Sequence, residues 1–386
     1  MNRADFVEEA PGRFAPTTGG AFGFVPNPLP PDLKLSWELV RRLELAERAL
    51  SRLAGAGSTL PNPYLLITPF TRREAVLSSR IEGTQASLSD LLSYEAAGLI
   101  DPDRADVTEV ANYVLALEFG LRRIKELPLS LRLIRELHER LMRELRGQSH
   151  DKGEFRRHQN WIGPPGSTIE RARYVPPPPN ELLPVLDAFE KYLYAPSPLP
   201  ALIRIALVHY QFEAAHPFLD GNGRLGRLLI TLMLISEGLL SHPLLYLSVY
   251  LERKRGDYYQ ALLEVSQKNE WARWLEFFLI GVESQSNDAL TRAMRLQALA
   301  SQYRDRLQQN RSSGVLLRLA DQLFHTPAVT VKKVATVLNI TQVAAQRNID
   351  KLQHAGILKE VTQRRRGRIY LAVEIVRTTE EPIPSI

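Results

Sequence analysis

The sequence predicts a mainly α-helical protein with one small β-hairpin and a C-terminal winged helix–turn–helix domain. Apolar residues recur at helical spacing along most of the 386-residue chain. One segment, residues 153–179, departs from that pattern because two extended pieces flank a Gly- and Pro-rich turn. From Ser312 onward, three short helical units precede two β-like pieces, which is the order of a winged helix–turn–helix.

The periodicity places the helices in order along the chain. Residues 1–34 are rich in Gly and Pro, and we expect them to form an extended lead-in that wraps over the rest of the molecule. After this lead-in, helices are expected at residues 36–55, 71–80 with a continuation to about 97, 106–126, 129–145, 180–194, 201–215, 223–238, 256–267, 270–285 and 287–309.

The hairpin and the tail divide the chain into regions. The hairpin's extended pieces are expected near 155–163 and 172–176, and prolines at 176–179 then impose polyproline-like geometry. In the tail, helical units precede the β-like pieces, and these segments lie at 314–324, 330–340, 341–358 and within 359–376. We therefore expect an N-terminal region at 1–105, a central helical domain at 106–311 and the winged helix–turn–helix domain at 312–386.

Composition narrows the function classes. The chain is 44% hydrophobic and 24% charged, which is typical of a globular protein. It has no cysteine, which excludes disulfides and thiolate chemistry and is compatible with a reducing cytoplasm. The N-terminal stretch MNRADFVEEAPGRF lacks an apolar core, and no apolar run reaches membrane-spanning length, so we expect a cytoplasmic protein with no membrane partner. The net charge of +6 permits an anionic partner without requiring one.

Residues 216–227, HPFLDGNGRLGR, concentrate the chemistry of the chain. The stretch contains GNGRLG, which matches the dinucleotide fingerprint G-x-G-x-x-G. That fingerprint needs a strand before the glycines, but residues 201–215 have a helical pattern, and so does the segment that follows. The sequence therefore predicts a tight loop between two helices rather than a Rossmann turn.

The residue types in this loop suit phosphoryl or nucleotidyl transfer. Glycines at a loop-to-helix junction let backbone N–H groups converge on an anion, and the helix dipole favours negative charge there. Arg224 and Arg227 share a helix face, and their guanidinium forks suit phosphate oxygens. Asp220 offers the hard oxygen that Mg²⁺ takes beside phosphates, and His216 is the candidate general base. An ordinary turn with a structural histidine is the alternative, but so many coincidences in one loop favour function.

The same stretch resembles the complete signature of the Fic-domain family, H-x-F-x-[DE]-G-N-G-R-x-x-R. Three further segments, FVPNPLPP (24–31), LPNPYLLITPF (60–70) and REAVLSSRIEGT (73–84), resemble the N-terminal region of bacterial Fic proteins. The segment GEFRRHQNWIG…YVPPPP resembles their flap hairpin, and a C-terminal winged helix also recurs in such proteins. The resemblance implies a Fic-type helical core, with residues 106–311 as the catalytic domain.

The resemblance implies transfer of AMP from ATP to a Ser, Thr or Tyr hydroxyl of a protein. His216 would take the hydroxyl proton, Asp220 would hold Mg²⁺ between the α- and β-phosphates, and the two arginines would bind the β- and γ-phosphates. A tyrosine pair would lie beside the adenine, and Ser266 stands where the family often has Asn. The flap would cover the nucleotide and offer a strand edge to the target. The implied ATP-binding residues are Gly221, Asn222, Gly223, Arg224, Leu225, Gly226, Arg227, Tyr258, Tyr259, Asn160, Trp161, Ile162 and Gly163.

The segment SSRIEG (78–83) is similar to the family's inhibitory pattern [ST]-x-x-x-E-[GN], through Ser78, Glu82 and Gly83. The resemblance implies an N-terminal inhibitory helix, in which Glu82 pairs with Arg227 and removes the fork that the γ-phosphate needs. The alternative is an ordinary helix C-terminus closed by Gly83.

Two function classes stay open at this point. The first is a transferase that AMPylates a target protein or itself and removes AMP in addition; the intact GNGR favours AMP over phosphate or phosphocholine. The second is a DNA-binding regulator, acting through residues 312–386 and the basic patch RRRGR (364–368), with the Fic site secondary or acting as a de-AMPylase. A solvated turn is an equal alternative for that patch. A homodimer is compatible with either class.

Overall fold

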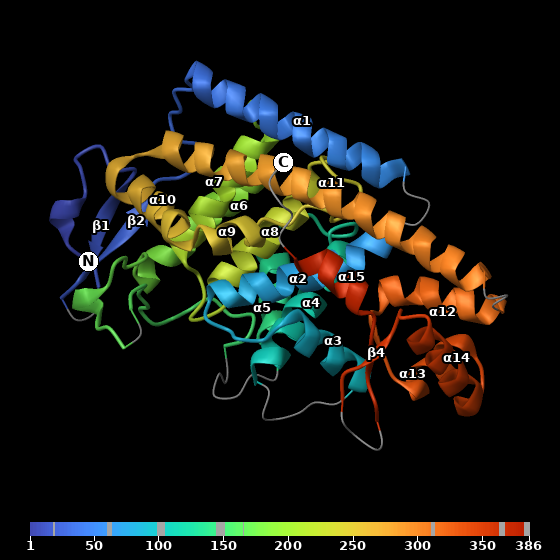
Figure 1. Cartoon of the computed structure of the whole chain (residues 1–386). Helices are drawn as coiled ribbons and strands as arrows, with labels where there is room; N and C mark the ends of the chain where they lie inside the picture. The colour runs from blue at the N-terminus through green and yellow to red at the C-terminus, as the bar shows by residue number, and fades with distance from the viewer. Residues whose placement is uncertain are drawn as a thin grey trace.

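A computed structural model describes residues 1–17, 20–59, 64–98, 105–143, 151–164, 166–309, 313–362 and 367–381. The expected mainly α-helical fold is confirmed (Figure 1). Two helices form its centre, α7 (Ala201–Ala215) and α8 (Asn222–Ser236). Both helices carry apolar residues on every face, so nearly all of their side chains are buried. The loop that joins them carries the motif of residues 216–227.

Further helices enclose this central pair. On the side of α8 lie α2 (Tyr64–Ile81), α4 (Ala105–Arg123) and α5 (Leu131–Leu141). On the side of α7 lie α6 (Pro179–Tyr194) and α10 (Arg255–Lys268). The short helices α3 (Leu88–Ala97) and α9 (Ser248–Arg253) pack against α2. Helix α9 was not predicted from the sequence.

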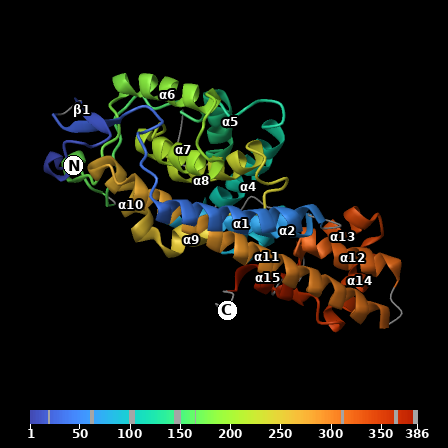
Figure 2. The ribbon, with the colours of Figure 1, turned by 90° about the horizontal axis from the view of Figure 1, so that it is seen from above.

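The longest helix, α11 (Trp271–Gln309), lies along α1 (Trp37–Thr59), as Figures 1 and 2 show. The sequence predicted two helices here, at 270–285 and 287–309, and that division was wrong. The run Ser284–Asp288 has weak helix formers, which resembles a break. Ser286 and Ala289 are buried, so packing holds these residues in one continuous helix despite their propensity.

The N-terminal lead-in contains a hairpin of its own. Strands β1 (Gly12–Pro16) and β2 (Phe22–Pro26) pair antiparallel, with Phe14 opposite Phe24. The rings of Phe6, Phe14 and Phe24 cluster there, and the Phe24 N–H donates to the Val175 carbonyl at 2.8 Å. The sequence predicted the extended lead-in but missed this pairing.

The hairpin expected at 155–163 and 172–176 is less regular than predicted. Its only bridge among the residues described there joins Ile162 to Tyr174. The segment between them contains a short 3-10 helix, Ile169–Arg171. We keep the name flap for residues 155–176.

The predicted C-terminal elements follow in the expected order. Helix α12 (Gly314–His325) precedes α13 (Val331–Leu338) and α14 (Gln342–His354), and the short strands are β3 (Ala328–Val329), β4 (Lys359–Glu360) and β5 (Tyr370–Leu371). The strands form one sheet in the order β3–β5–β4, in which β3, between α12 and α13 in the chain, was not predicted. A final helix, α15 (Val373–Glu380), was not predicted; it packs back against α2 and α11. None of the described helices is long and apolar enough to cross a membrane.

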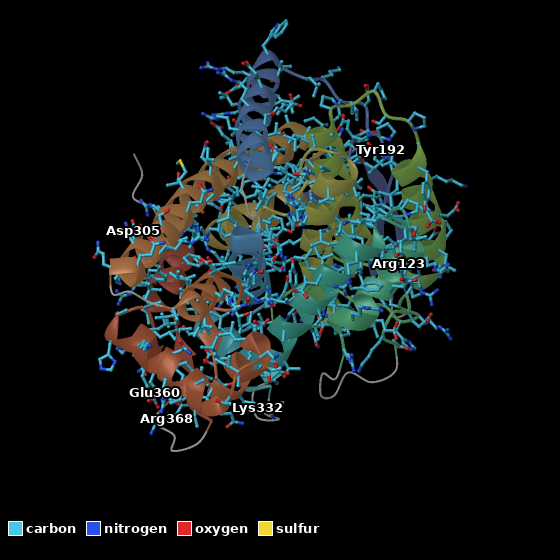
Figure 3. The ribbon with its side chains drawn as sticks, turned by 90° about the vertical axis from the view of Figure 1, so that its right-hand side faces the viewer. Arg123, Tyr192, Asp305, Lys332, Glu360 and Arg368 are labelled. Carbon is cyan, nitrogen blue, oxygen red and sulfur yellow. The ribbon has the colours of Figure 1, made fainter. Side chains whose placement is uncertain are left out.

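Of the basic patch RRRGR (364–368), the structure describes Gly367 and Arg368. Figure 3 shows Arg368 beside Glu360, and the two side chains form an ion pair at 3.6 Å. Arg364, Arg365 and Arg366 lie outside the described residues. DNA binding through residues 312–386 therefore stays a prediction.

The buried side chain of Arg292 joins α15 to α11, and it gives a test of the fold. Its guanidinium binds Asp288 at 2.7 Å and donates to the carbonyls of Thr378 and Glu381 at 2.8 and 2.9 Å. We expect Arg292→Met to lower the free energy of unfolding by about 1–3 kcal/mol, because the helix-end carbonyls lose their donor, while Arg73 still donates to Asp288 at 3.1 Å. Denaturant unfolding measures this, with exposed Arg295→Met as the control. Equal stability of the two variants would show that α15 does not depend on this contact.

Candidate active site

The motif loop is shaped by two residues in the left-handed region of backbone conformation. His216 ends α7 with φ 44°, and Gly221 precedes α8 with φ 78°. Asn222 clamps the turn between them: its side-chain Oδ1 accepts from the Phe218 N–H at 2.9 Å, and its Nδ2 donates to the Phe218 carbonyl at 2.8 Å. The Asn222 side chain is therefore used by the loop itself, and the ATP contact expected of Asn222 stays a prediction for its backbone.

A histidine that the sequence analysis left without a role supports this loop from α5. The ring of His138 stacks on Phe218 with 3.8 Å between centroids. Its Nδ1 accepts from the Gly153 N–H at 2.9 Å, so the proton of the neutral ring is on Nε2, which donates to the Asp220 carbonyl at 3.1 Å. Burial lowers the pKa of His138 to about 4, which keeps this tautomer in place at neutral pH.

The flap holds the catalytic candidate from the other side. The Nε of buried Arg156 donates to the His216 carbonyl at 2.9 Å, and Asn160 Nδ2 donates to the Phe218 carbonyl at 2.8 Å. Burial, followed by the nearby charge of Arg156, lowers the pKa of His216 to about 4. His216 is thus neutral at pH 7. A hydrogen bond from the ring to the Glu213 backbone opposes this lowering, and with buried Nδ1 as that donor, Nε2 is the nitrogen that accepts an incoming proton.

The second arginine of the motif is held by α2 and by the residue that follows it. Arg227 Nε donates to Ser78 Oγ at 2.9 Å, and its Nη2 donates to the Ser78 carbonyl at 2.8 Å and to Glu82 Oε1 at 2.6 Å. The Arg227 side chain is 1% exposed, whereas that of Glu82 is 33% exposed. Ser78, Glu82 and Arg227, predicted as an inhibitory set, lie together, and Gly83 follows with φ 108°.

Arg224 is equally buried but has a different partner. Its Nη1 donates to Glu109 Oε1 on α4, and its Nη2 lies 3.4 Å from Asp220 Oδ1. The sequence analysis gave no role to Glu109, because nothing in the local pattern of α4 marks it.

The glycines of the motif let carboxylates approach the first turns of α8. A Cβ on Gly223 would overlap Glu82 Oε1, and one on Gly226 would overlap Glu213 Oε1. Burial raises the pKa of Glu213 to about 8, although Arg227 opposes this shift, so Glu213 is largely neutral near pH 7. Glu82 is thus the carboxylate that supplies negative charge to Arg227.

Several predicted nucleotide contacts lie elsewhere. Leu225 and Tyr258 are each 0% exposed. The hydroxyl of Tyr258 donates to His209 Nε2 at 2.8 Å, while His209 Nδ1 donates to the Gly226 carbonyl at 3.2 Å. Tyr258 therefore supports α8 from behind in this structure, and its place beside the adenine stays a prediction; Tyr259 is only partly buried. Ser266 is buried in the core, where its hydroxyl binds Tyr210 at 2.9 Å.

Within the flap, only Asn160 of the predicted set binds the motif loop. Trp161 is 42% exposed, and its Nε1 donates to the Ser167 carbonyl at 2.9 Å. Ile162 uses its backbone N–H and carbonyl on Tyr174 and Arg173, and Gly163 lies against Ser167. The outer part of the flap thus presents an exposed aromatic side chain next to an internally bonded turn.

The donor set fits a polyphosphate with Mg²⁺. Arg224 Nε and Arg227 Nη1 are buried donors that have no acceptor in the described part of the chain. Buried donors without partners are costly, and an anionic oxygen would satisfy them. The Asp220 side chain is 49% exposed and offers one carboxylate. A carboxylate oxygen beside phosphates is the kind of ligand that Mg²⁺ takes.

The chain is similar in sequence to known proteins. Residues 40–122 match the family model described as the Fic/DOC family N-terminal region, and residues 128–234 match that of the Fic/DOC family. The chain is 27% identical over 202 residues to the protein adenylyltransferase Fic of Drosophila erecta, and 28% identical to that of Drosophila virilis. The match covers 51% of this chain and 37% of the Drosophila erecta protein, so the chain spans well under half of that relative's length.

Solved structures show the same fold. A Fic family protein from Desulfovibrio desulfuricans superposes with a TM-score of 0.55 at 17% identity, covering 89% of this chain and 98% of that one. Fic-1 of C. elegans superposes with a TM-score of 0.52 at 22% identity, covering 67% of this chain and 74% of that one.

The buried histidine of α5 gives a pH-dependent test of the site. The pKa of His138 is lowered to about 4 in the folded protein, whereas an unfolded histidine has a pKa of about 6.5. Between pH 6.5 and 4, His138 is therefore protonated in the unfolded chain and neutral in the folded chain. Its stabilising contribution is complete above pH 6.5 and is lost as pH falls toward 4. We expect His138→Gln to flatten the dependence of unfolding free energy on pH in this window by up to about 1.4 kcal/mol per pH unit. Denaturant unfolding at several pH values measures the slope, and an unchanged slope would contradict the assignment.

Proposed function

On the premise that the chain carries a Fic/DOC-family domain in residues 40–122 and 128–234, we propose that it is a protein adenylyltransferase held inactive by Glu82. The reaction moves AMP from ATP to a Ser, Thr or Tyr hydroxyl of a target protein. The observation that carries the proposal is the ion pair between the buried guanidinium of Arg227 and Glu82. A carboxylate lies 2.6 Å from this buried guanidinium, at the end of an anion-binding helix terminus, in a position suited to a phosphate oxygen.

The chain's own groups supply the steps of the transfer. Neutral His216 accepts the proton of the target hydroxyl as its oxygen forms a bond to the α-phosphorus. The bond between the α-phosphorus and the oxygen bridging to the β-phosphate breaks, and pyrophosphate leaves. Asp220 would hold Mg²⁺, which neutralises phosphate charge when bound. The backbone N–H groups at the start of α8, with Arg224 and Arg227, orient the phosphates.

Autoinhibition follows from competition for one guanidinium. Ser78 and Glu82 use both Nε and Nη2 of Arg227, which form the edge that would bind two phosphate oxygens. ATP binds with its phosphates misplaced for in-line attack while this edge is occupied. The Glu82 side chain is one-third exposed and follows the last residue of α2, so it can leave without unfolding the helix.

The remaining parts of the proposal concern partners. The exposed Trp161 and the adjoining turn of the flap are suited to contact a target segment, and self-modification would use the same site. De-AMPylation by the same site, a homodimer and a cytoplasmic location stay predictions.

The proposed base is tested by His216→Ala. We expect ATP affinity to stay within about twofold and AMP transfer to fall at least about a hundredfold, because general-base catalysis contributes at that scale. Transfer of label from α-phosphate-labelled ATP measures the rate, with surface His354→Ala as the control. Retained transfer would show that His216 only shapes the loop.

The proposed lock is tested by Glu82→Gly. We expect AMP transfer, including self-modification, to rise about tenfold or more, because a charge-assisted pair worth about 1–3 kcal/mol no longer competes with ATP. Adding Arg227→Ala should remove the gain, and Asp220→Ala or omission of Mg²⁺ should silence the activated variant. A folded, ATP-binding Glu82→Gly protein no faster than wild type would refute the lock and leave the transferase assignment standing.

A further inference from the structure

The two motif arginines are held in opposite ways. A guanidinium binds two oxygens most readily along the edge formed by Nε and Nη2. In Arg227 that edge is filled, by Ser78 at 2.9 and 2.8 Å and by Glu82 at 2.6 Å. In Arg224 the acidic partner Glu109 binds Nη1 instead, outside that edge.

The phosphate-binding edge of Arg224 remains open. Its Nε is buried without an acceptor among the residues described, and its Nη2 has one long contact, 3.4 Å to Asp220 Oδ1. This edge therefore faces the side of the loop that carries the proposed Mg²⁺ ligand. The Arg224 side chain is 3% exposed, so it has little freedom to adopt another orientation.

Glu109 is itself fixed by its surroundings. It lies on α4, which packs against both α2 and α8. Its Oε1 also accepts from Thr84 Oγ1 at 3.3 Å, in the segment that follows Glu82. The neighbouring Gln85 N–H donates to Asp106 on the same helix at 2.8 Å. The Glu109 carboxylate is therefore held both by its place on α4 and by the segment that follows Glu82.

We propose that Glu109 is a positioning residue for the transfer reaction: it binds Nη1 of Arg224 and turns the Nε–Nη2 edge of that guanidinium toward the phosphates of ATP. The proposal rests on the proposed function for the identity of the anion. It assigns opposite effects to two acidic residues that each pair with a motif arginine. Removing Glu82 frees the occupied Nε–Nη2 edge of Arg227. Removing Glu109 takes away the contact that orients the open Nε–Nη2 edge of Arg224.

The test uses the full chain carrying Glu82→Gly, so that the proposed lock does not mask the effect. We expect added Glu109→Gln to lower kcat/KM for ATP at least about tenfold, because the guanidinium loses its preorganised orientation. Glu109→Asp should recover part of the loss. The matched control is Glu118→Gln, which removes another α4 carboxylate that pairs with an arginine, Arg72, away from the motif.

A double-mutant cycle separates positioning from a general structural role. In a chain that also carries Arg224→Ala, Glu109→Gln should cause no further loss, because the group that it orients is absent. ATP affinity, measured by calorimetry in the non-transferring His216→Ala background, should follow the same pattern. An equal loss with and without Arg224 would overturn the proposal, and so would a Glu109→Gln protein as active as its parent or more active.

A measurement without nucleotide keeps the proposal independent of the transfer assignment. The arginine Nε–H resonances of the protein can be recorded by NMR, and the signal lost in Arg224→Lys identifies Arg224. We expect Glu109→Gln to shift or broaden this signal and Glu118→Gln to leave it unchanged. An Arg224 signal that is unchanged in Glu109→Gln would overturn the proposal even if AMP transfer is found. A shifted signal with ATP affinity reduced, but no AMP transfer by any variant, would support positioning and refute the transferase.

Discussion

The buried guanidinium of Arg227 is the constraint around which the site is organised. A charge removed from water needs a carboxylate and further acceptors, and Ser78 and Glu82 supply them from a segment about 145 residues earlier. Position 223 is a glycine, and a Cβ there would overlap the Glu82 carboxylate. The first turn of α8 therefore leaves room for Glu82 to reach Arg227. The proposed inhibition and the proposed phosphate binding therefore share this one ion pair, which also joins the residue after α2 to α8.

The loop that carries His216 is held by buried polar contacts rather than by its own conformation. Asn222 closes the turn from within, Arg156 binds the His216 carbonyl from the flap, and His138 binds the Asp220 carbonyl from α5. Each of these groups has lost its water on folding, so each contact is costly to break. The proposed general base and the carboxylate proposed to hold Mg²⁺ are therefore fixed in relation to the start of α8.

The sequence predicted what is local and missed what is assembled across the chain. The motif, the helices around it and the pairing of Glu82 with Arg227 could be inferred, because spacing and a family pattern mark them. Glu109 and Arg156 could not, because neither spacing nor a family pattern marks them, and they meet the loop across 115 and 60 residues of chain only once the chain is folded. The contact of Tyr258 with His209 was missed for a related reason: a tyrosine beside a nucleotide and a tyrosine that supports a buried histidine have the same local pattern. The N-terminal hairpin and the continuity of α11 likewise depend on partners that periodicity does not identify.

The most direct measurement of the central claim is the coupling between Glu82 and Arg227 in ATP affinity. Calorimetric titration of ATP with Mg²⁺ into wild type, Glu82→Gly, Arg227→Ala and the double variant, each with His216→Ala to prevent turnover, completes the cycle. If Glu82 and the γ-phosphate compete for one guanidinium, Glu82→Gly tightens ATP binding only when Arg227 is present. Equal tightening in the presence and absence of Arg227 would contradict the account, because Glu82 would then act on ATP by another route.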